Sequence, residues 1–325
     1  MNRSVQSEGE LKMNKEQNKG YALVLAAGAL WGTIGFFSTM LSNLGMPSNS
    51  VAFFRVLSAT IVLGVILLVK GKGSGLFRIS KRGLFSCMLV GFVSQALYNM
   101  CYMSTIELSG MATAAVFLYT SPVYVAILSK LLFHEQLTSN KILAIALNII
   151  GCVLAVTGGN FTDMKLSTRG LIMGILAGFC YALLPILSRL GADDENSYTA
   201  AFYGQAFAVL LLFVLIRPYN GIGCEFNWQM LLVLIGFGLV PSAMGYITYY
   251  GGLSLITETS KVQVLGSIET VVAALVGLVA FGQSVGLIKM GGIALVLISI
   301  AIMNMKRQER AVPDSNDIVG AEYSE

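Results

Sequence analysis

The feature that most constrains this chain is a series of ten apolar segments of about 20 residues, separated by short polar stretches. An α-helix needs about 20 apolar residues to cross a hydrocarbon core of about 30 Å. The alternating ten-residue pattern of an outer-membrane barrel is absent from the sequence. The predicted spans are Tyr21–Ser42, Val51–Val69, Leu84–Ile106, Met111–Leu132, Asn140–Val156, Gly170–Leu190, Tyr198–Ile216, Met230–Leu253, Thr259–Phe281 and Gly286–Asn304.

Composition supports the same fold class. Hydrophobic residues make up 55% of the chain and charged residues 12%, whereas a soluble domain carries about 25% charged residues. The first apolar segment is too long for the core of a signal peptide and is followed by no small-residue cleavage pattern, so it is expected to be retained. The sequence therefore predicts an all-α polytopic membrane protein with ten transmembrane helices.

The positions of lysine and arginine predict the orientation. If the N-terminus lies inside, only five of the 21 basic residues fall on the outer side, namely Arg55, Lys165, Arg169, Arg217 and Lys289. This bias predicts a multi-pass protein of the plasma membrane with both termini in the cytoplasm. The net charge of +4 reflects the same sidedness and gives no reason to expect nucleic acid as a partner.

The two halves of the chain resemble each other at an offset of about 150 residues. The matching pairs are Gly28 with Gly178, Trp31 with Tyr181, Tyr98 with Tyr246, and Tyr102 with Tyr250. Because each half holds five spans, the second half must enter the membrane from the opposite side, which predicts two inverted repeats. Transporters built in this way place their site near the bilayer midplane, at the interface of the repeats.

The predicted organisation of the chain follows from this repeat. A cytoplasmic tail covers residues 1–20 and the first five-helix repeat covers 21–158. A linker at 159–169 precedes the second repeat at 170–305, and a cytoplasmic tail at 306–325 ends the chain. The end of that tail, Arg310 to Glu325, is polar and is predicted to be disordered.

Several motifs resemble the EamA-type branch of the drug/metabolite transporter superfamily. They are ALWGTIGFFS at 29–38, FFRVLSATIVL at 53–63, LYTSPVYVAILSKLLFHEQLT at 118–138 and SKVQVLGSIETVVAALVGLVAFGQ at 260–283. The resemblance covers residues 20 to 305. It implies ten helices in two inverted repeats around a central cavity, and movement of small organic metabolites, often outward.

The chain departs from this family at two positions of the ninth span. Thr270 follows Glu269 where the family usually has proline, and Gln283 stands where it usually has an acidic residue. The first repeat keeps both features, as Pro122 and Glu135. Because proline removes a backbone donor from a helix, its absence predicts that the ninth span is straighter than the fourth.

Glu269 is the ionisable residue that lies deepest within a predicted span. Charge at membrane depth is costly, so such a residue is by default a hypothesis of function. In one interpretation Glu269 lines a cavity, where a carboxyl group removed from water holds a proton readily or pairs with a cationic group of the substrate. In the other, hydroxyl or amide groups of a neighbouring helix hold it and it fixes packing. Both remain open.

Aromatic and amide side chains form a stripe at helical spacing along the third span. Other spans carry aromatic residues at matching depths. Rings and amides inside a span suit an amphipathic solute, and a ring face can hold an amine. The alternative is that they bind the helices to one another. The predicted substrate-binding residues are Trp31, Gln95, Tyr98, Asn99, Tyr102, Tyr181, Tyr246, Tyr250 and Glu269.

Other polar residues and the prolines receive structural interpretations. Lys261 and Arg55 lie near span ends and are expected to extend toward the headgroups. His134 is expected at the membrane interface. The five cysteines show no metal-ligand spacing and are expected to be inert packing residues. Three prolines within spans are candidate hinges, namely Pro122, Pro185 and Pro241.

Two motifs of other protein classes are missing. The sequence contains no GxxxxGK[ST] loop and no HExxH, so we expect neither an ATPase nor an enzyme, and no cofactor or metal. The prediction is a secondary transporter that moves a small amphipathic metabolite, such as an amino acid, outward by alternating access, with Glu269 as the candidate for proton coupling. The alternatives are an importer of the same fold and a non-transporting membrane enzyme or sensor subunit. The sequence leaves the oligomeric state open.

Overall fold

The computed structural model describes residues 2–70, 76–162, 167–191, 195–216 and 227–305. Within these ranges the regular structure is entirely helical, and ten segments are long and apolar enough to cross a membrane. Their bounds agree closely with the predicted spans, except that the first begins earlier, at Asn14. The disorder predicted for the end of the chain and the inert role predicted for Cys224 concern residues outside these ranges.

The first repeat contains five spans, three of them interrupted. The first span consists of α1 and α2, the third of α4, a π-helical segment and α5, and the fourth of α6 and α7. The bounds are α1 (Asn2–Trp31), α2 (Ile34–Asn43), α3 (Ser48–Lys70), α4 (Lys81–Leu89), the π-helical segment Val90–Leu97, α5 (Tyr98–Ser109), α6 (Met111–Leu118), α7 (Ser121–Phe133) and α8 (Ser139–Thr157).

The second repeat follows the same order, with its eighth and ninth spans interrupted. Its first span is the continuous helix α9, which contains Pro185. The bounds are α9 (Thr168–Gly191), α10 (Ser197–Ile216), α11 (Trp228–Phe237), the π-helical segment Gly238–Met244, α12 (Gly245–Leu253), α13 (Thr259–Gly266), α14 (Ile268–Phe281) and α15 (Leu287–Asn304).

Irregular features of the backbone recur at one offset, which confirms two repeats. The π-helical segments begin at Val90 and Gly238, 148 residues apart. The left-handed residues that end α7 and α14, His134 and Gly282, have the same separation. Since each repeat contributes five spans, the two repeats cross the membrane in opposite directions. The predicted fold of two inverted five-helix repeats is therefore confirmed.

The ninth span, predicted to be straighter than the fourth because it lacks proline, is interrupted as the fourth is. The helix is interrupted at Ser267, between α13 and α14, although the span contains no proline. The Ser267 hydroxyl donates to the carbonyl oxygen of Val264 at 2.6 Å. A side-chain bond to the backbone three residues earlier competes with the helical hydrogen bonds. It accompanies an interruption at the position equivalent to Tyr119, where the fourth span is also interrupted.

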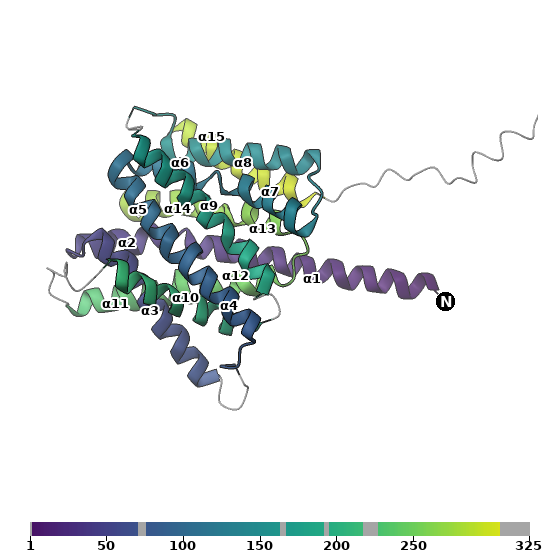
Figure 1. Ribbon diagram of the computed structural model, residues 1–325. Coiled ribbons are helices and arrows are strands. Elements are labelled where there is room, and N and C mark those ends of the chain that lie inside the picture. Colours follow the sequence, from purple (N-terminus) through teal and green to yellow (C-terminus); the bar gives the residue numbers. More distant parts are fainter. Residues whose placement is uncertain (1, 71–75, 163–166, 192–194, 217–226, 306–325) are drawn as a thin grey trace, which may run out of the picture.

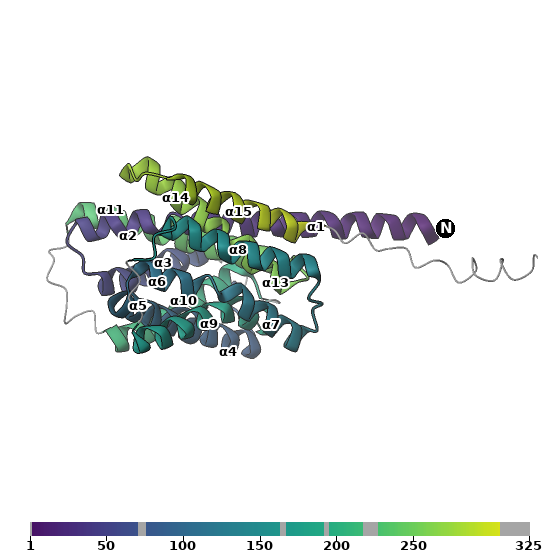
Figure 2. The ribbon, with the colours of Figure 1, turned by 90° about the horizontal axis from the view of Figure 1, so that it is seen from above.

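Each repeat packs its first span against the later spans of the other repeat. The helix α1 lies against α12 and α13, and α9 lies against α5, α6 and α7. At the edges of the bundle, α3 pairs with α10 and α8 pairs with α15. Figures 1 and 2 both show α8 beside α15, and both show α1 extending beyond the bundle at its N-terminal end. The space between the repeats is thus enclosed by segments from both.

Two glycines at equivalent positions allow these close approaches. A Cβ atom on Gly28 would lie 2.6 Å from the carbonyl oxygen of Gly266, just before the interruption of the ninth span. A Cβ atom on Gly178 would lie 2.5 Å from the carbonyl oxygen of Phe117, just before the interruption of the fourth. Small residues let membrane helices approach closely, and here they bring each first span onto the break in the opposite repeat.

Candidate functional site

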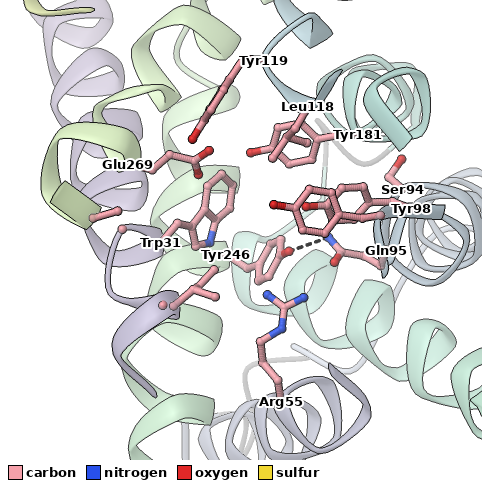
Figure 3. A pocket seen from close by; sticks show the side chains of 15 residues that line it. Trp31, Arg55, Ser94, Gln95, Tyr98, Leu118, Tyr119, Tyr181, Tyr246 and Glu269 are labelled. Carbon is pink, nitrogen blue, oxygen red and sulfur yellow. Dashed lines mark hydrogen bonds between the residues drawn. The ribbon is translucent and has the colours of Figure 1, made fainter. Parts of the chain in front are cut away.

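A cavity of about 290 Å³ lies between the two repeats, where the interrupted helices meet. Non-helical backbone at membrane depth is tolerated where it lines such a space. Figure 3 shows the side chains that face it. The lining residues are Trp31, Gly32, Ile34, Gly35, Arg55, Ser94, Gln95, Tyr98, Tyr102, Leu118, Tyr119, Tyr181, Tyr246, Glu269 and Ala273.

The three interruptions beside the cavity share one local device. Thr33 donates its hydroxyl hydrogen to the carbonyl oxygen of Leu30 at 2.7 Å, and Thr120 donates to that of Phe117 at 2.6 Å. The bond from Ser267 to the Val264 carbonyl oxygen is the third of this kind. In each case the backbone N–H of the same residue also donates to that carbonyl oxygen, at 3.1 to 3.2 Å. Each break is therefore a tight turn in which one carbonyl accepts both a backbone and a side-chain hydrogen bond.

Glu269 lies in the first turn of α14, directly after the break at Ser267. A carboxylate in the first turn of a helix is stabilised by the positive end of the helix dipole. The side chain is partly buried and lines the cavity. In Figure 3 the hydroxyl groups of Tyr119 and Tyr181 are directed at its carboxylate. Glu269 thus faces an enclosed polar space and phenolic donors.

Aromatic rings form much of the cavity wall. The Trp31 ring lies 5.3 Å from that of Tyr246, and the Tyr98 ring lies 5.2 Å from that of Tyr181. The tilted arrangements are those that ring quadrupoles favour. The side-chain amide of Gln95 donates to the Tyr246 hydroxyl at 2.6 Å, which joins the third span to the eighth. The wall therefore offers ring faces whose positions are fixed by contacts between the repeats.

We call one end of the bundle the N-terminal face. It carries the start of the first span and the loops 134–138 and 254–258. On its side the cavity is closed by buried rings, since Trp31 also packs on Tyr249 at 5.1 Å, and Tyr249 packs on Tyr250 at 5.8 Å. The cavity residues of α3, α5 and α6 lie in the halves of these spans that are remote from this face. The cavity is thus displaced toward the opposite face.

A cluster of four charged residues lies at the N-terminal face and joins the repeats. Lys141 lies 2.8 Å from Glu258 and 3.9 Å from Glu135, and Lys261 lies 2.6 Å from Glu258. Burial raises the pKa of Glu258, but the hydrogen bonds from Lys141 and Lys261 outweigh burial and hold this pKa below its ordinary value. Glu135 also accepts hydrogen bonds from the backbone N–H groups of Thr259 and Ser260.

This cluster corrects the interpretation of Lys261. The side chain pairs with Glu258 and lies 3.5 Å from the Tyr21 hydroxyl, so it is held between helices where headgroup contact was expected. His134 ends α7 in a left-handed conformation at the N-terminal face, which agrees with a structural role. Of the cysteines, Cys87, Cys101, Cys152 and Cys180 are buried free thiols.

The structure brings seven of the nine predicted site residues together in the cavity and places two elsewhere. Asn99 lines a separate pocket of about 200 Å³, and its side-chain amide donates to the Gln95 carbonyl oxygen at 2.6 Å. Tyr250 is 5% exposed and belongs to the ring cluster behind the cavity. The seven that line the cavity are Trp31, Gln95, Tyr98, Tyr102, Tyr181, Tyr246 and Glu269.

Arg55 is the charged cavity residue that the sequence interpretation assigned wrongly. It was expected to extend to the headgroups, but its guanidinium group points into the cavity below the Tyr246 ring (Figure 3). Tyr119 was also missed, although it lies within the motif at 118–138 and next to an interruption. Arg55 likewise lies within the motif at 53–63, so both residues had the same sequence signal, and the direction in which each side chain points depends on how its helix is turned.

Comparison with known proteins agrees with the fold. A protein of Archaeoglobus fulgidus named as an uncharacterized transporter is 29% identical over 87% of this chain and 95% of its own length. The pseudopaline exporter of Pseudomonas aeruginosa is 24% identical over 69% of this chain and 77% of its own. A solved crystal structure with 16% identity superposes with a TM-score of 0.73, covering 88% of this chain and 96% of that one, and so shares the fold.

The model of the EamA-like transporter family matches this chain twice, at residues 18–157 and 168–305. The two matches correspond to the two sets of five spans, and together they cover most of the chain. This confirms the resemblance seen in the sequence motifs. The protein is a multi-pass membrane protein, and it belongs to the EamA-like transporter family.

Proposed function

We propose that this protein is a secondary transporter that exports a small amphipathic metabolite by alternating access. The observation that carries the proposal is the position of Glu269, a carboxylate in a cavity enclosed by broken helices of both repeats. Inverted-repeat transporters use such sites. Outward movement is supported by the relative in Pseudomonas aeruginosa, which is named as an exporter.

Glu269 supplies a basis for coupling to protons. One carboxylate can hold a proton or pair with a cationic group of the substrate, and one occupant excludes the other. If the cavity faces each side of the membrane in turn, a proton that enters from outside releases substrate outward, and a substrate that enters from inside releases the proton inward. Competition for Glu269 is therefore sufficient for an inward proton gradient to drive export.

The proposed orientation places the N-terminal face in the cytoplasm of a cell whose plasma membrane holds the protein. The bias of basic residues supports this side. In that orientation the ring cluster and the charged cluster close the cytoplasmic end, which supports assigning the structure to an outward-facing or occluded state of the proposed cycle. The breaks at Thr33, Thr120 and Ser267 are the proposed hinges, because the α-helices are interrupted there.

Metabolite export from growing cells tests this function while the identity of the substrate is still open. Cells that produce the protein are grown on ¹³C-labelled glucose, and labelled compounds in the medium are measured by mass spectrometry. At least one compound should accumulate outside with the wild-type protein and fail to accumulate with Glu269→Gln. Glu16→Gln is the matched control, since Glu16 is exposed at the N-terminal end of the first span and outside the cavity. Identical media for wild-type and Glu269→Gln cells would contradict the proposal.

A further inference from the structure

The cavity contains two opposite charges that do not pair with each other. Arg55 enters from α3 and Glu269 enters from α14. Among the described residues no ion pair within 4 Å involves either side chain. Arg55 makes a weak contact at 3.4 Å with the side-chain oxygen of Asn99, and Glu269 faces tyrosine hydroxyls. Both formal charges are left for a ligand to neutralise.

Aromatic rings separate the two charges. In Figure 3 the Glu269 carboxylate lies beside Trp31, and the Arg55 guanidinium lies on the far side of Tyr246. The Trp31 and Tyr246 rings are themselves neighbours, with centroids 5.3 Å apart. A molecule that touches both charges must therefore extend across two ring faces. Its cationic and anionic groups must be well separated.

The cost of charge at this depth makes a complementary ligand favourable. An unpaired charge in low-dielectric surroundings is expensive, and a partner of opposite sign recovers part of that cost. The guanidinium group of Arg55 matches the geometry of a carboxylate, which it can bind through two parallel hydrogen bonds. An ammonium group at Glu269 would also lie near the Trp31 ring, where cation–π attraction adds to the ion pair.

We propose that the cavity binds an elongated zwitterion, with its cationic group at Glu269, its carboxylate at Arg55 and its apolar body on the Trp31 and Tyr246 rings. This assignment rests on the proposed function in treating the cavity as the transport site, and it narrows the substrate class. An α-amino acid carries both charges on one carbon and reaches only one of the two side chains. A compound whose charges are separated by a chain of several carbons reaches both.

Binding of isomeric probes to the purified full-length protein tests this arrangement. The probes are 6-aminohexanoic acid and its isomer norleucine, which differ only in the position of the amine, together with the singly charged hexylamine and hexanoic acid. In isothermal titration calorimetry in detergent, the dissociation constant of 6-aminohexanoic acid should be at least about tenfold lower than that of each other probe. The factor corresponds to one additional charge-assisted hydrogen bond. Equal affinity for the two isomers would overturn the proposal.

Variants assign the two ends of the ligand. Arg55→Gln should reduce the affinity for 6-aminohexanoic acid to that for hexylamine, and Arg55→Lys should restore part of the difference. Arg169→Gln is the matched control, because Arg169 is exposed outside the cavity, and it should bind as the wild type does. An unchanged preference in Arg55→Gln would overturn the role of Arg55. The wild-type comparison of isomers holds even if a variant fails to fold.

The same probes separate this inference from the proposed function. Proteoliposomes are loaded with labelled 6-aminohexanoic acid, and its release is followed with and without a proton gradient. Preferential binding without release would support the zwitterion site and contradict transport through it. Export of metabolites from cells, combined with no preference among the isomers, would support transport and contradict the zwitterion site.

Discussion

The ammonium group of Lys141 lies 2.8 Å from the carboxylate of Glu258. Lys141 belongs to the first repeat and Glu258 directly precedes the ninth span, so the ion pair ties the two repeats at the N-terminal face. Lys141 is 5% exposed, and a buried charge of this kind depends on its partners. The closed state of this face is therefore expected to depend on the charged cluster.

Glu258→Gln should destabilise the protein at neutral pH by removing the shared partner of Lys141 and Lys261. Because ion pairing lowers the pKa of Glu258 in the folded state, the stabilisation is present above the unfolded pKa of about 4.3 and is lost as the pH falls through the folded value. Melting temperatures in detergent from pH 7 to pH 3 should show a gap between wild type and variant that closes at acid pH. Glu107→Gln, at an exposed site, should show no such gap. A gap that persists at pH 3 would contradict this assignment.

Glu269→Gln should abolish the dependence of transport on a proton gradient while exchange of substrate across the membrane continues. The amide occupies nearly the same volume but cannot carry a proton between the two sides. Flux in proteoliposomes, measured with a pH gradient and separately under equal pH on both sides, separates these effects. Proton-driven flux that survives the substitution would contradict the role of Glu269 as the proton carrier.

Gly28→Ala should destabilise the protein through overpacking, because its Cβ atom would meet the Gly266 carbonyl oxygen and the Ile268 side chain. Overpacking in a tight interior costs about 1–3 kcal/mol. Gly178→Ala should behave in the same way, since it meets the Phe117 carbonyl oxygen. Gly291→Ala is the control, because no atom lies within 4 Å of its Cβ position. Equal melting temperatures for all three variants would contradict the close contacts of Gly28 with Gly266 and of Gly178 with Phe117.

The hydrogen bond from Gln95 to Tyr246 can be isolated by a double-mutant cycle. Single variants Gln95→Leu and Tyr246→Phe each remove one partner, and the double variant removes both. Interhelical hydrogen bonds in membrane proteins contribute about 0.6 kcal/mol on average, so the coupling energy from unfolding curves should be close to this. Strict additivity of the two single effects would mean that the third and eighth spans do not share this bond.

Much of the fold follows from patterns that a sequence displays directly. The lengths of the apolar segments predict the spans, and the pairing of Tyr98 with Tyr246 predicts the repeat, which the equal offsets of irregular backbone confirm. The ninth span shows where such rules end. Proline is visible in a sequence, whereas the bond from the Ser267 hydroxyl to Val264 that accompanies the break is one of several conformations open to serine.

The residue types in the spans allowed the existence of the cavity to be predicted. Which of these residues line it depends on the rotation of each helix, which the sequence does not show. Rings and a carboxylate deep in spans indicate an enclosed polar space, and seven of the nine predicted residues line one. Asn99 lies four residues beyond Gln95 on the same polar stripe, yet it faces a different pocket. The π-helical segment that ends at Leu97 alters the helical register between them, and this displacement has no sequence signature. Arg55 was misassigned for a related reason, since depth alone does not show which neighbour a helix face meets.

Labelling of a single introduced cysteine tests alternating access most directly, because the reaction does not depend on which substrate is carried. In a variant without native cysteines, Ala273→Cys places a thiol in the cavity wall, and Leu275→Cys places one on the same helix at a position that is 51% exposed toward the surroundings of the bundle. A membrane-impermeant maleimide is applied to intact cells and, separately, to inverted vesicles. If access alternates, the thiol at 273 reacts from both sides of the membrane, and the thiol at 275, surrounded by lipid, reacts from neither. Reaction at 273 from one side only, or from neither, would contradict alternating access.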